Sequence, residues 1–180
     1  RVLLIGVGGL GCPAALYLAA AGVGTIGLMD GDTVSLLNLH RQILYTDFEI
    51  GMPKVTCAAN ALHRCNSSVT IQTYPVMADA DNLPELVRQY DIVLDCTDHL
   101  PTKFLINDVC VAERVMSTVE FLPIRGRFSP MCPRKRVRVI AAFLKHRRKK
   151  GLFRLVKKWV FWERLPVSLA ICRHWRQFAI

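Results

Sequence analysis

The chain has 180 residues, 52% of them hydrophobic, which suits one domain with its own core rather than two full domains. No stretch is apolar over the roughly 20 residues that a membrane-spanning helix needs. The net charge of +10 is uneven: residues 1–120 hold 7 basic and 13 acidic side chains, hence −6, and residues 121–180 hold 17 and 1, hence +16. We therefore expect a domain over residues 1–120 and a separate basic tail over residues 121–180.

The cysteines favour a reducing compartment. There are seven, an odd number, and no two of them form a C-x-x-C pair. Neither a disulfide framework nor a closed zinc site follows from that pattern. A cytoplasmic location is therefore the expectation. Because the chain opens directly on a strand-like run rather than on the layout of a secretory signal, we also expect its natural N-terminus to lie upstream.

Strand-like and helix-like segments alternate over residues 1–114. In chain order they are a strand at 1–6, a helix at 12–21, a strand at 25–30, a helix at 53–65, a strand at 69–76, a helix at 81–90, a strand at 91–98 and a helix at 102–114. Such alternation predicts a doubly wound, Rossmann-like parallel sheet of the α/β class. Asp81 or Asn82 is the expected cap of the third helix. After about residue 120 the alternation stops, and basic and aromatic residues replace it.

The first functional signal is the glycine loop Gly6-x-Gly8-Gly9-x-Gly11, which lies between the first strand and the first helix. Glycines let the backbone turn tightly and approach a phosphate, and the helix N-terminus offers unpaired N–H groups. Asp30 ends the second strand, where a carboxylate can accept hydrogen bonds from ribose hydroxyls. The alternative is that the glycines only allow close packing of helix on sheet. The context of strand, loop, helix, strand and acid favours nucleotide binding.

The second signal is a polar cluster that follows Asp30. Asn38, Arg41, Gln42 and Lys54 stand in the segment between the second strand and the second helix. A guanidinium fork and a compact ammonium charge suit a polyphosphate. The alternative for Arg41 and Lys54 is a pair of solvated surface charges. With the glycine loop upstream, we interpret them as ligands of ATP phosphates rather than of a nicotinamide cofactor.

The third signal is the sequence Asp95-Cys96-Thr97-Asp98 at the end of the fourth strand. Ligands of such sheets bind outside the carboxyl ends of the strands, and Mg²⁺ there prefers one or two carboxylates together with phosphate oxygens. A purely structural role is easier to accept for Asp95 than for Asp98. Cys96 is interpreted as a buried small hydrophobe and not as a nucleophile.

Three stretches together resemble the ThiF/MoeB family of adenylyltransferases: RVLLIGVGGLGCPAALYLAAAGVGTIGLMDGDTVSLLNLHRQ, then GMPK, then YDIVLDCTDHLPTKFLIND. The resemblance covers about residues 1–114. It is strongest to the eukaryotic adenylyltransferase–sulfurtransferases, which activate the ubiquitin-like sulfur carriers of molybdopterin synthesis and tRNA thiolation. It implies that the C-terminal glycine carboxylate of such a carrier attacks the α-phosphate of MgATP, so that an acyl-adenylate forms and pyrophosphate leaves. It also implies that intact relatives are homodimers.

The resemblance carries an ATP site onto this chain, with Asp98 as the acid that organises Mg²⁺ and with Arg41, Lys54 and Asp98 as the catalytic group. The site residues that it implies are Gly9, Asp30, Leu37, Asn38, Leu39, His40, Arg41, Lys54, Asp98 and His99. Two of them depart from the family pattern, which has Ser at the position of Leu37 and Asn at that of His99. The first change removes a hydroxyl near the phosphates, and the second adds a titratable ring beside the Mg²⁺ acid.

The tail departs further from the family, which continues with a strand, a carrier-reading segment, paired C-x-x-C zinc motifs and a thiol-bearing loop. None of these is recognisable here, and Cys132 lacks a C-x-x-C partner, so the structural Zn²⁺ of the family is not expected. We hypothesise that a frameshift, a misread exon boundary or a truncated gene copy produced residues 121–180. The fold would then be an incomplete ThiF-type domain that retains an ATP site and that can be inactive because the partner-binding and cysteine-bearing half is missing.

Two other functions compete with this one. A NAD- or FAD-dependent oxidoreductase would share the glycine loop but would not need Arg41, Lys54 and Asp98. A non-catalytic nucleotide-binding protein could use the basic tail, with Trp159, Trp162 and Trp175, to bind RNA or an anionic membrane. A peptide that is basic by accident accounts for the tail more simply, so contact with nucleic acid or membrane is not expected.

Overall fold

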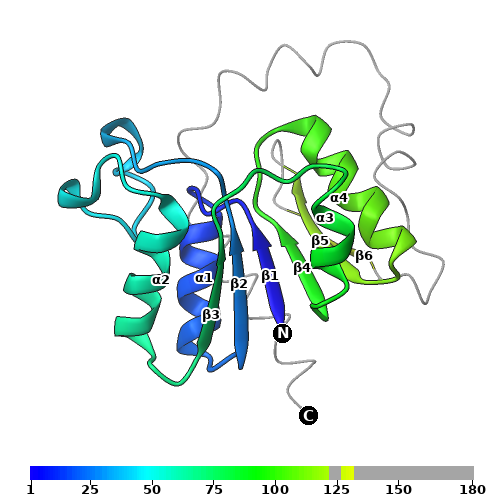
Figure 1. Ribbon diagram of the computed structural model, residues 1–180, viewed down its shortest axis with the longest axis horizontal. Coiled ribbons are helices and arrows are strands. Elements are labelled where there is room, and N and C mark those ends of the chain that lie inside the picture. Colours follow the sequence, from blue (N-terminus) through cyan, green and yellow to red (C-terminus); the bar gives the residue numbers. More distant parts are fainter. Residues whose placement is uncertain (122–126, 132–180) are drawn as a thin grey trace.

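The computed structural model describes residues 1–121 and 127–131, and within them six strands form one sheet (Figure 1). The strands are β1 (Val2–Ile5), β2 (Thr25–Met29), β3 (Thr70–Tyr74), β4 (Ile92–Asp95), β5 (Met116–Phe121) and β6 (Arg127–Met131). The α-helices are α1 (Gly11–Ala20), α2 (Lys54–Cys65), α3 (Leu83–Val87) and α4 (Leu100–Ala112), and the connection between β2 and α2 holds the short 3-10 turns η1 (Leu36–Asn38) and η2 (Asp47–Glu49).

The sheet is doubly wound, as predicted. Its strand order is β3-β2-β1-β4-β5-β6, and every neighbouring pair is parallel except β5 with β6. Val2 of β1 lies opposite Ile26 of β2 on one side and opposite Ile92 of β4 on the other. The chain thus winds outward from β1 to β3, returns, and winds the other way from β4. The point of reversal lies between β1 and β4, where such sheets bind their ligands.

The eight elements expected over residues 1–114 are all present, with one correction at the third helix. Residues 81–90 contain only a short helix, α3, and Asn82 at its N-cap makes no side-chain capping bond. The side chain of Asp79 caps this turn instead, because its Oδ1 accepts the N–H groups of Asp81 and Asn82 at 2.9 and 2.8 Å. The carboxylate that satisfies these donors therefore lies two residues earlier than the expected Asp81.

The sequence pattern did not indicate β5 or β6. β5 extends the parallel sheet beside β4, and β6 pairs with it antiparallel and lies beyond residue 120. Neither segment is a continuous apolar run, and Pro130 in the second argues against a strand on sequence grounds alone. Proline is tolerated at sheet edges, which is where β6 lies. Cys132, Trp159, Trp162, Trp175 and the rest of residues 132–180 lie outside the described residues.

The core has two layers, one on each face of the sheet. Leu4 packs with α1 and α2, whereas its neighbour Leu3 packs with α3 and α4, and both side chains are fully buried. Consecutive strand residues point to opposite faces, so continuous apolar strands are what a sheet covered on both sides requires. Figure 1 shows the two helix pairs flanking the sheet. Among the described residues no helix is long and apolar enough to cross a membrane.

Candidate functional site

The three sequence signals meet at one edge of the sheet, where β1, β2 and β4 end. The N–H of Gly6 donates to the carbonyl of Met29 at 2.8 Å, and the N–H of Cys96 donates to the carbonyl of Ile5 at 2.9 Å. Backbone pairing therefore holds the first residues beyond β1, β2 and β4 beside one another. The glycine loop, Asp30 and the segment that leads to Asp98 all start from this edge.

Close backbone contact explains two of the loop glycines. Gly6 has a φ of +90°, and a Cβ there would lie 3.0 Å from the carbonyl carbon and oxygen of Cys96. A Cβ on Gly11 would overlap the carbonyl oxygen of Gly6. These two glycines thus serve packing, which was the alternative interpretation of the motif. The N–H groups of Gly8 and Gly9 donate no hydrogen bond within the described part of the chain, so their expected role in binding a ligand stays a prediction.

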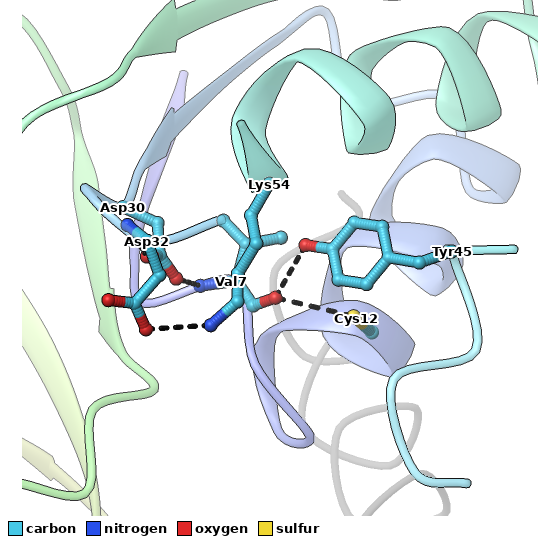
Figure 2. Close-up of polar contacts among 6 residues, drawn as sticks. All are labelled: Val7, Cys12, Asp30, Asp32, Tyr45 and Lys54. Atoms are coloured by element: carbon cyan, nitrogen blue, oxygen red, sulfur yellow. Dashed lines mark hydrogen bonds and ion pairs between the residues drawn. The ribbon is translucent and has the colours of Figure 1, made fainter. Parts of the chain in front are cut away.

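Asp30 is buried at the end of β2 and holds the loop in place. Its Oδ2 accepts the N–H of Val7 at 2.7 Å, and its Oδ1 accepts the N–H of Asp32 at 2.9 Å (Figure 2). An ionised carboxylate has about four lone-pair positions, so each oxygen can still accept a further hydrogen bond. The ribose contact expected of Asp30 therefore stays a prediction that is compatible with its loop-holding role.

Lys54 begins α2, and its side chain is only 5% exposed. Its Nζ lies 2.7 Å from Oδ2 of Asp32, whose own side chain is 54% exposed (Figure 2). An ammonium group has three donors, so Nζ keeps donors for an anion after this ion pair forms. The pair refutes the alternative of a solvated lysine. Asp32 was not anticipated, because no residue pattern marks a carboxylate that pairs with a lysine 22 positions away.

Arg41 follows η1 and is half-buried. Its Nη1 lies 3.5 Å from the carbonyl oxygen of Leu37 and 3.4 Å from Nε2 of His40. No carboxylate of the described residues forms an ion pair with this guanidinium. Leu37 is 81% exposed, and its expected place in the site stays a prediction.

Gln42 lies next to the glycine loop and is buried. Its Nε2 would lie 3.6 Å from a Cβ on Gly8. Its Oε1 is buried and has no hydrogen-bond partner among the described residues. Gln42 therefore joins the segment after η1 to the loop, and it offers a free acceptor there. Asn38 and Leu39 lie on the same segment and are half-buried.

The acid that ends β4, Asp95, and the acid three residues beyond it, Asp98, have different environments. Asp95 is buried, forms an ion pair with Lys103 at 3.2 Å, and accepts hydrogen bonds from the N–H and Oγ1 of Thr97 at 3.0 and 2.7 Å. Its structural role, preferred on sequence grounds, fits these contacts. Asp98 is exposed at the sheet edge. His99 is also exposed, and its Nδ1 lies 2.9 Å from Oγ1 of Thr102.

Metal and thiol chemistry are restricted in the part of the chain that the structure describes. No group of three or more His, Cys, Asp or Glu side chains there could hold a metal ion. Burial raises the pKa of the Cys12 thiol to about 11 and that of Cys110 to about 12, so both stay protonated near neutral pH. Cys96 is half-buried and packs against the core cluster beneath α1. A Mg²⁺ ion held by one carboxylate and by phosphate oxygens needs no larger cluster.

Comparison with known proteins finds a matching family model and curated relatives that share the name adenylyltransferase and sulfurtransferase. The model of the ThiF family matches residues 1–147, which includes part of the basic segment. Adenylyltransferase and sulfurtransferase MOCS3 of Danio rerio is 47% identical over 129 residues, 71% of this chain and 28% of that protein. Adenylyltransferase and sulfurtransferase UBA4 of Candida albicans is 49% identical over 111 residues, 62% of this chain and 25% of that protein. The chain thus spans about a quarter of the length of these curated relatives.

Solved structures show the same fold. E. coli MccB with MccA-N7isoASN matches with a TM-score of 0.68 and 26% identity over 74% of this chain and 39% of that chain. E. coli tRNA N6-threonylcarbamoyladenosine dehydratase, TcdA, solved in complex with ATP, matches with a TM-score of 0.63 and 25% identity over 69% of this chain and 53% of that chain. None of the relatives described here is an oxidoreductase.

Proposed function

The chain belongs to the ThiF family, and from that premise we propose that it carries the ATP-binding part of an adenylyltransferase. The substrate that we propose is the C-terminal glycine carboxylate of a ubiquitin-like sulfur carrier. The support is the identity of about 47–49% to proteins named adenylyltransferase and sulfurtransferase. Under this proposal residues 1–120 hold the ATP site, the carrier is the partner, and the cytoplasm is the compartment. Pairing as a homodimer, as expected for intact relatives, is part of the same proposal.

One observation carries the proposal: a buried lysine, a glycine loop with free N–H groups and a loop-holding aspartate all lie at the carboxyl ends of β1 and β2. A polyphosphate supplies the negative charge and the hydrogen-bond acceptors that would pair with the lysine and with the N–H groups of the loop. The N–H groups of Gly8 and Gly9 and the start of α1 present partial positive charge. Lys54 adds a full charge whose burial strengthens its interaction with an anion. The residues present therefore fit the nucleotide.

The chain's own residues would position the nucleotide and neutralise the charge on its phosphates, and none of them would attack the phosphorus. MgATP, when bound, would supply the activated α-phosphorus, at which a carrier carboxylate would displace pyrophosphate to form an acyl-adenylate. Asp98, exposed at the edge of the sheet, would hold the cation, and Arg41 and Lys54 would balance charge on the phosphates. Asp30 would accept hydrogen bonds from the ribose. A carboxylate is already ionised at neutral pH, so the first step needs no protein base or nucleophile.

The oxidoreductase alternative receives no support from the relatives, and ligand binding separates it from the proposal. We expect the chain to bind ATP and to discriminate against NAD and FAD. A preference for NAD over ATP would overturn the assignment.

Catalysis is tested by ATP–pyrophosphate exchange in the presence of a ubiquitin-fold sulfur carrier that ends in Gly-Gly. We expect carrier-dependent exchange, and we expect Asp98→Ala to reduce it by about 100-fold or more because the cation loses its carboxylate. Asp81→Ala is the matched control, since Asp81 is an exposed aspartate in the turn before α3 and is not one of the proposed site residues. Exchange that survives in Asp98→Ala would contradict the role of Asp98. ATP binding without any exchange would restrict the chain to nucleotide binding.

A further inference from the structure

The peptide group that follows Val7 is held by two buried side chains. The hydroxyl of Tyr45 donates to the carbonyl oxygen of Val7 at 2.6 Å, and the thiol of Cys12 lies 3.4 Å from the same oxygen (Figure 2). The N–H of Val7 is bound on the other side by Asp30. Tyr45 is 6% exposed and lies 38 positions further along the chain than Val7. This contact thus joins the glycine loop to the connection between β2 and α2.

The direction of the Tyr45 hydrogen bond is unambiguous. A carbonyl oxygen can only accept, so the hydroxyl is the donor. Burial raises the pKa of the Tyr45 hydroxyl far above its ordinary value, and Cys12 keeps its proton for the same reason. Both donors therefore persist over the whole physiological pH range.

The Val7 carbonyl determines where the next N–H points. The chain has no cis peptide bond in its described part, and in a trans peptide the C=O and the following N–H point in opposite directions. With the Val7 carbonyl aimed at Tyr45 and Cys12, the N–H of Gly8 is aimed away from them. That N–H has no acceptor among the described residues. The hydroxyl of Tyr45 thus keeps this donor of the glycine loop turned away from the side of Tyr45 and Cys12.

We propose that Tyr45 is a positioning residue of the nucleotide site, whose hydroxyl orients the Val7–Gly8 peptide so that the Gly8 N–H can bind a phosphate group. The inference rests on the proposed function, because ATP supplies the phosphates. Tyr45 also ends the segment that carries Arg41, and Gln42 of that segment lies beside Gly8. The same contact therefore ties the segment that carries Arg41 to the glycine loop.

Tyr45→Phe removes the hydroxyl and keeps the ring. We expect it to weaken ATP binding, measured by calorimetry, by about 3- to 10-fold, which is the range for one hydrogen bond. Adenosine binding should be unchanged, because Gly8 acts only on phosphates. Tyr90→Phe is the matched control: Tyr90 is also buried, and its hydroxyl lies 2.7 Å from Oε1 of Gln72 on the other face of the sheet. This variant should lose comparable stability and bind ATP and adenosine as the wild type does.

Amide hydrogen exchange of the nucleotide-free protein gives a readout that does not depend on ATP. We expect the Val7 N–H to exchange about 3- to 10-fold faster in Tyr45→Phe than in Tyr90→Phe. The reason is that only Tyr45→Phe removes the hydroxyl that holds the Val7 carbonyl. A chain that binds no ATP would refute the proposed function. The exchange rates would still test whether the Tyr45 hydroxyl holds the loop peptide. Unchanged exchange at Val7, or an equal loss of ATP and adenosine affinity in Tyr45→Phe, would overturn the inference.

Discussion

At the scale of single residues, neighbouring acids in this protein have different environments. Asp95 is buried and bound by Lys103 and Thr97, whereas Asp98, three residues later, is exposed at the sheet edge. Asp30 is tied to the loop through Val7. A carboxylate that is already satisfied by protein donors stabilises the fold, and one without such donors is available to a cation. The sequence alone places all three acids at the ends of strands and leaves their environments open.

Arg41 provides the residue-scale prediction. Arg41→Gln should weaken ATP binding by about 10- to 100-fold, because a charge-assisted hydrogen bond to phosphate is lost. The melting temperature should stay unchanged, since no described carboxylate forms an ion pair with Arg41. Calorimetry and thermal unfolding measure the two effects.

The control for this prediction is Arg64→Gln, which removes the same charge from the exposed last turn of α2. It should leave ATP affinity within about 2-fold of the wild type. Equal losses of affinity in the two variants would show that only the net charge of the molecule matters, and the assigned role of Arg41 would be wrong.

At the scale of elements, the turn between β1 and α1 depends on close backbone approach. Gly11→Ala would press a methyl group onto the carbonyl oxygen of Gly6, and neither group belongs to a flexible side chain. We expect the free energy of unfolding to fall by about 3 kcal/mol, at the upper end for overpacking. Urea unfolding followed by circular dichroism measures it.

Gly24→Ala is the matched change, because a Cβ on Gly24 would meet no atom within 4 Å. It should alter the free energy of unfolding by less than about 0.5 kcal/mol. If Gly11→Ala proved as harmless as Gly24→Ala, the loop would not need the close approach that the structure shows.

The conformation of the connection between β2 and α2 is the part of the fold that hydrophobic periodicity predicts least. This connection contains only two 3-10 turns, and long-range contacts define its course. Thr33 bridges to Pro53, the capping box of Thr46 and Glu49 closes η2, and Tyr45 docks on the glycine loop. The connection, shown in light blue in Figure 1, carries most of the residues expected to bind phosphate. Its conformation therefore decides whether those residues face the site.

At the scale of the whole molecule, buried thiols make stability sensitive to alkaline pH. Thiols ionise near 9.0 when unperturbed, and burial raises the pKa of Cys12 to about 11 and that of Cys110 to about 12. Above pH 9 the unfolded chain loses these protons first. The free energy of unfolding should therefore be independent of these thiols below pH 9 and should fall as the pH rises from there to about 12, the higher of the two folded-state pKa values.

Urea unfolding at about pH 8 and about pH 10 measures this decline. Cys110→Ala should make the decline shallower, because one of the buried thiols is gone. Cys65→Ala is the control, since Cys65 is exposed, and it should leave the slope unchanged. A Cys110→Ala protein with the wild-type slope would contradict the assigned cause.

The sequence by itself determined the order of strands and helices over residues 1–114 and the doubly wound sheet, and it predicts where a nucleotide site lies. These depend on local signals: short apolar runs, a glycine loop, and acids directly after strands. Only the tertiary structure decided that Lys54 pairs with Asp32, that Asp95 is occupied by Lys103, and that β5 and β6 extend the sheet. The Tyr45 contact with Val7 belongs to the same group. Each of these joins residues that packing brings together across several elements, and no period or motif in the chain records such contacts.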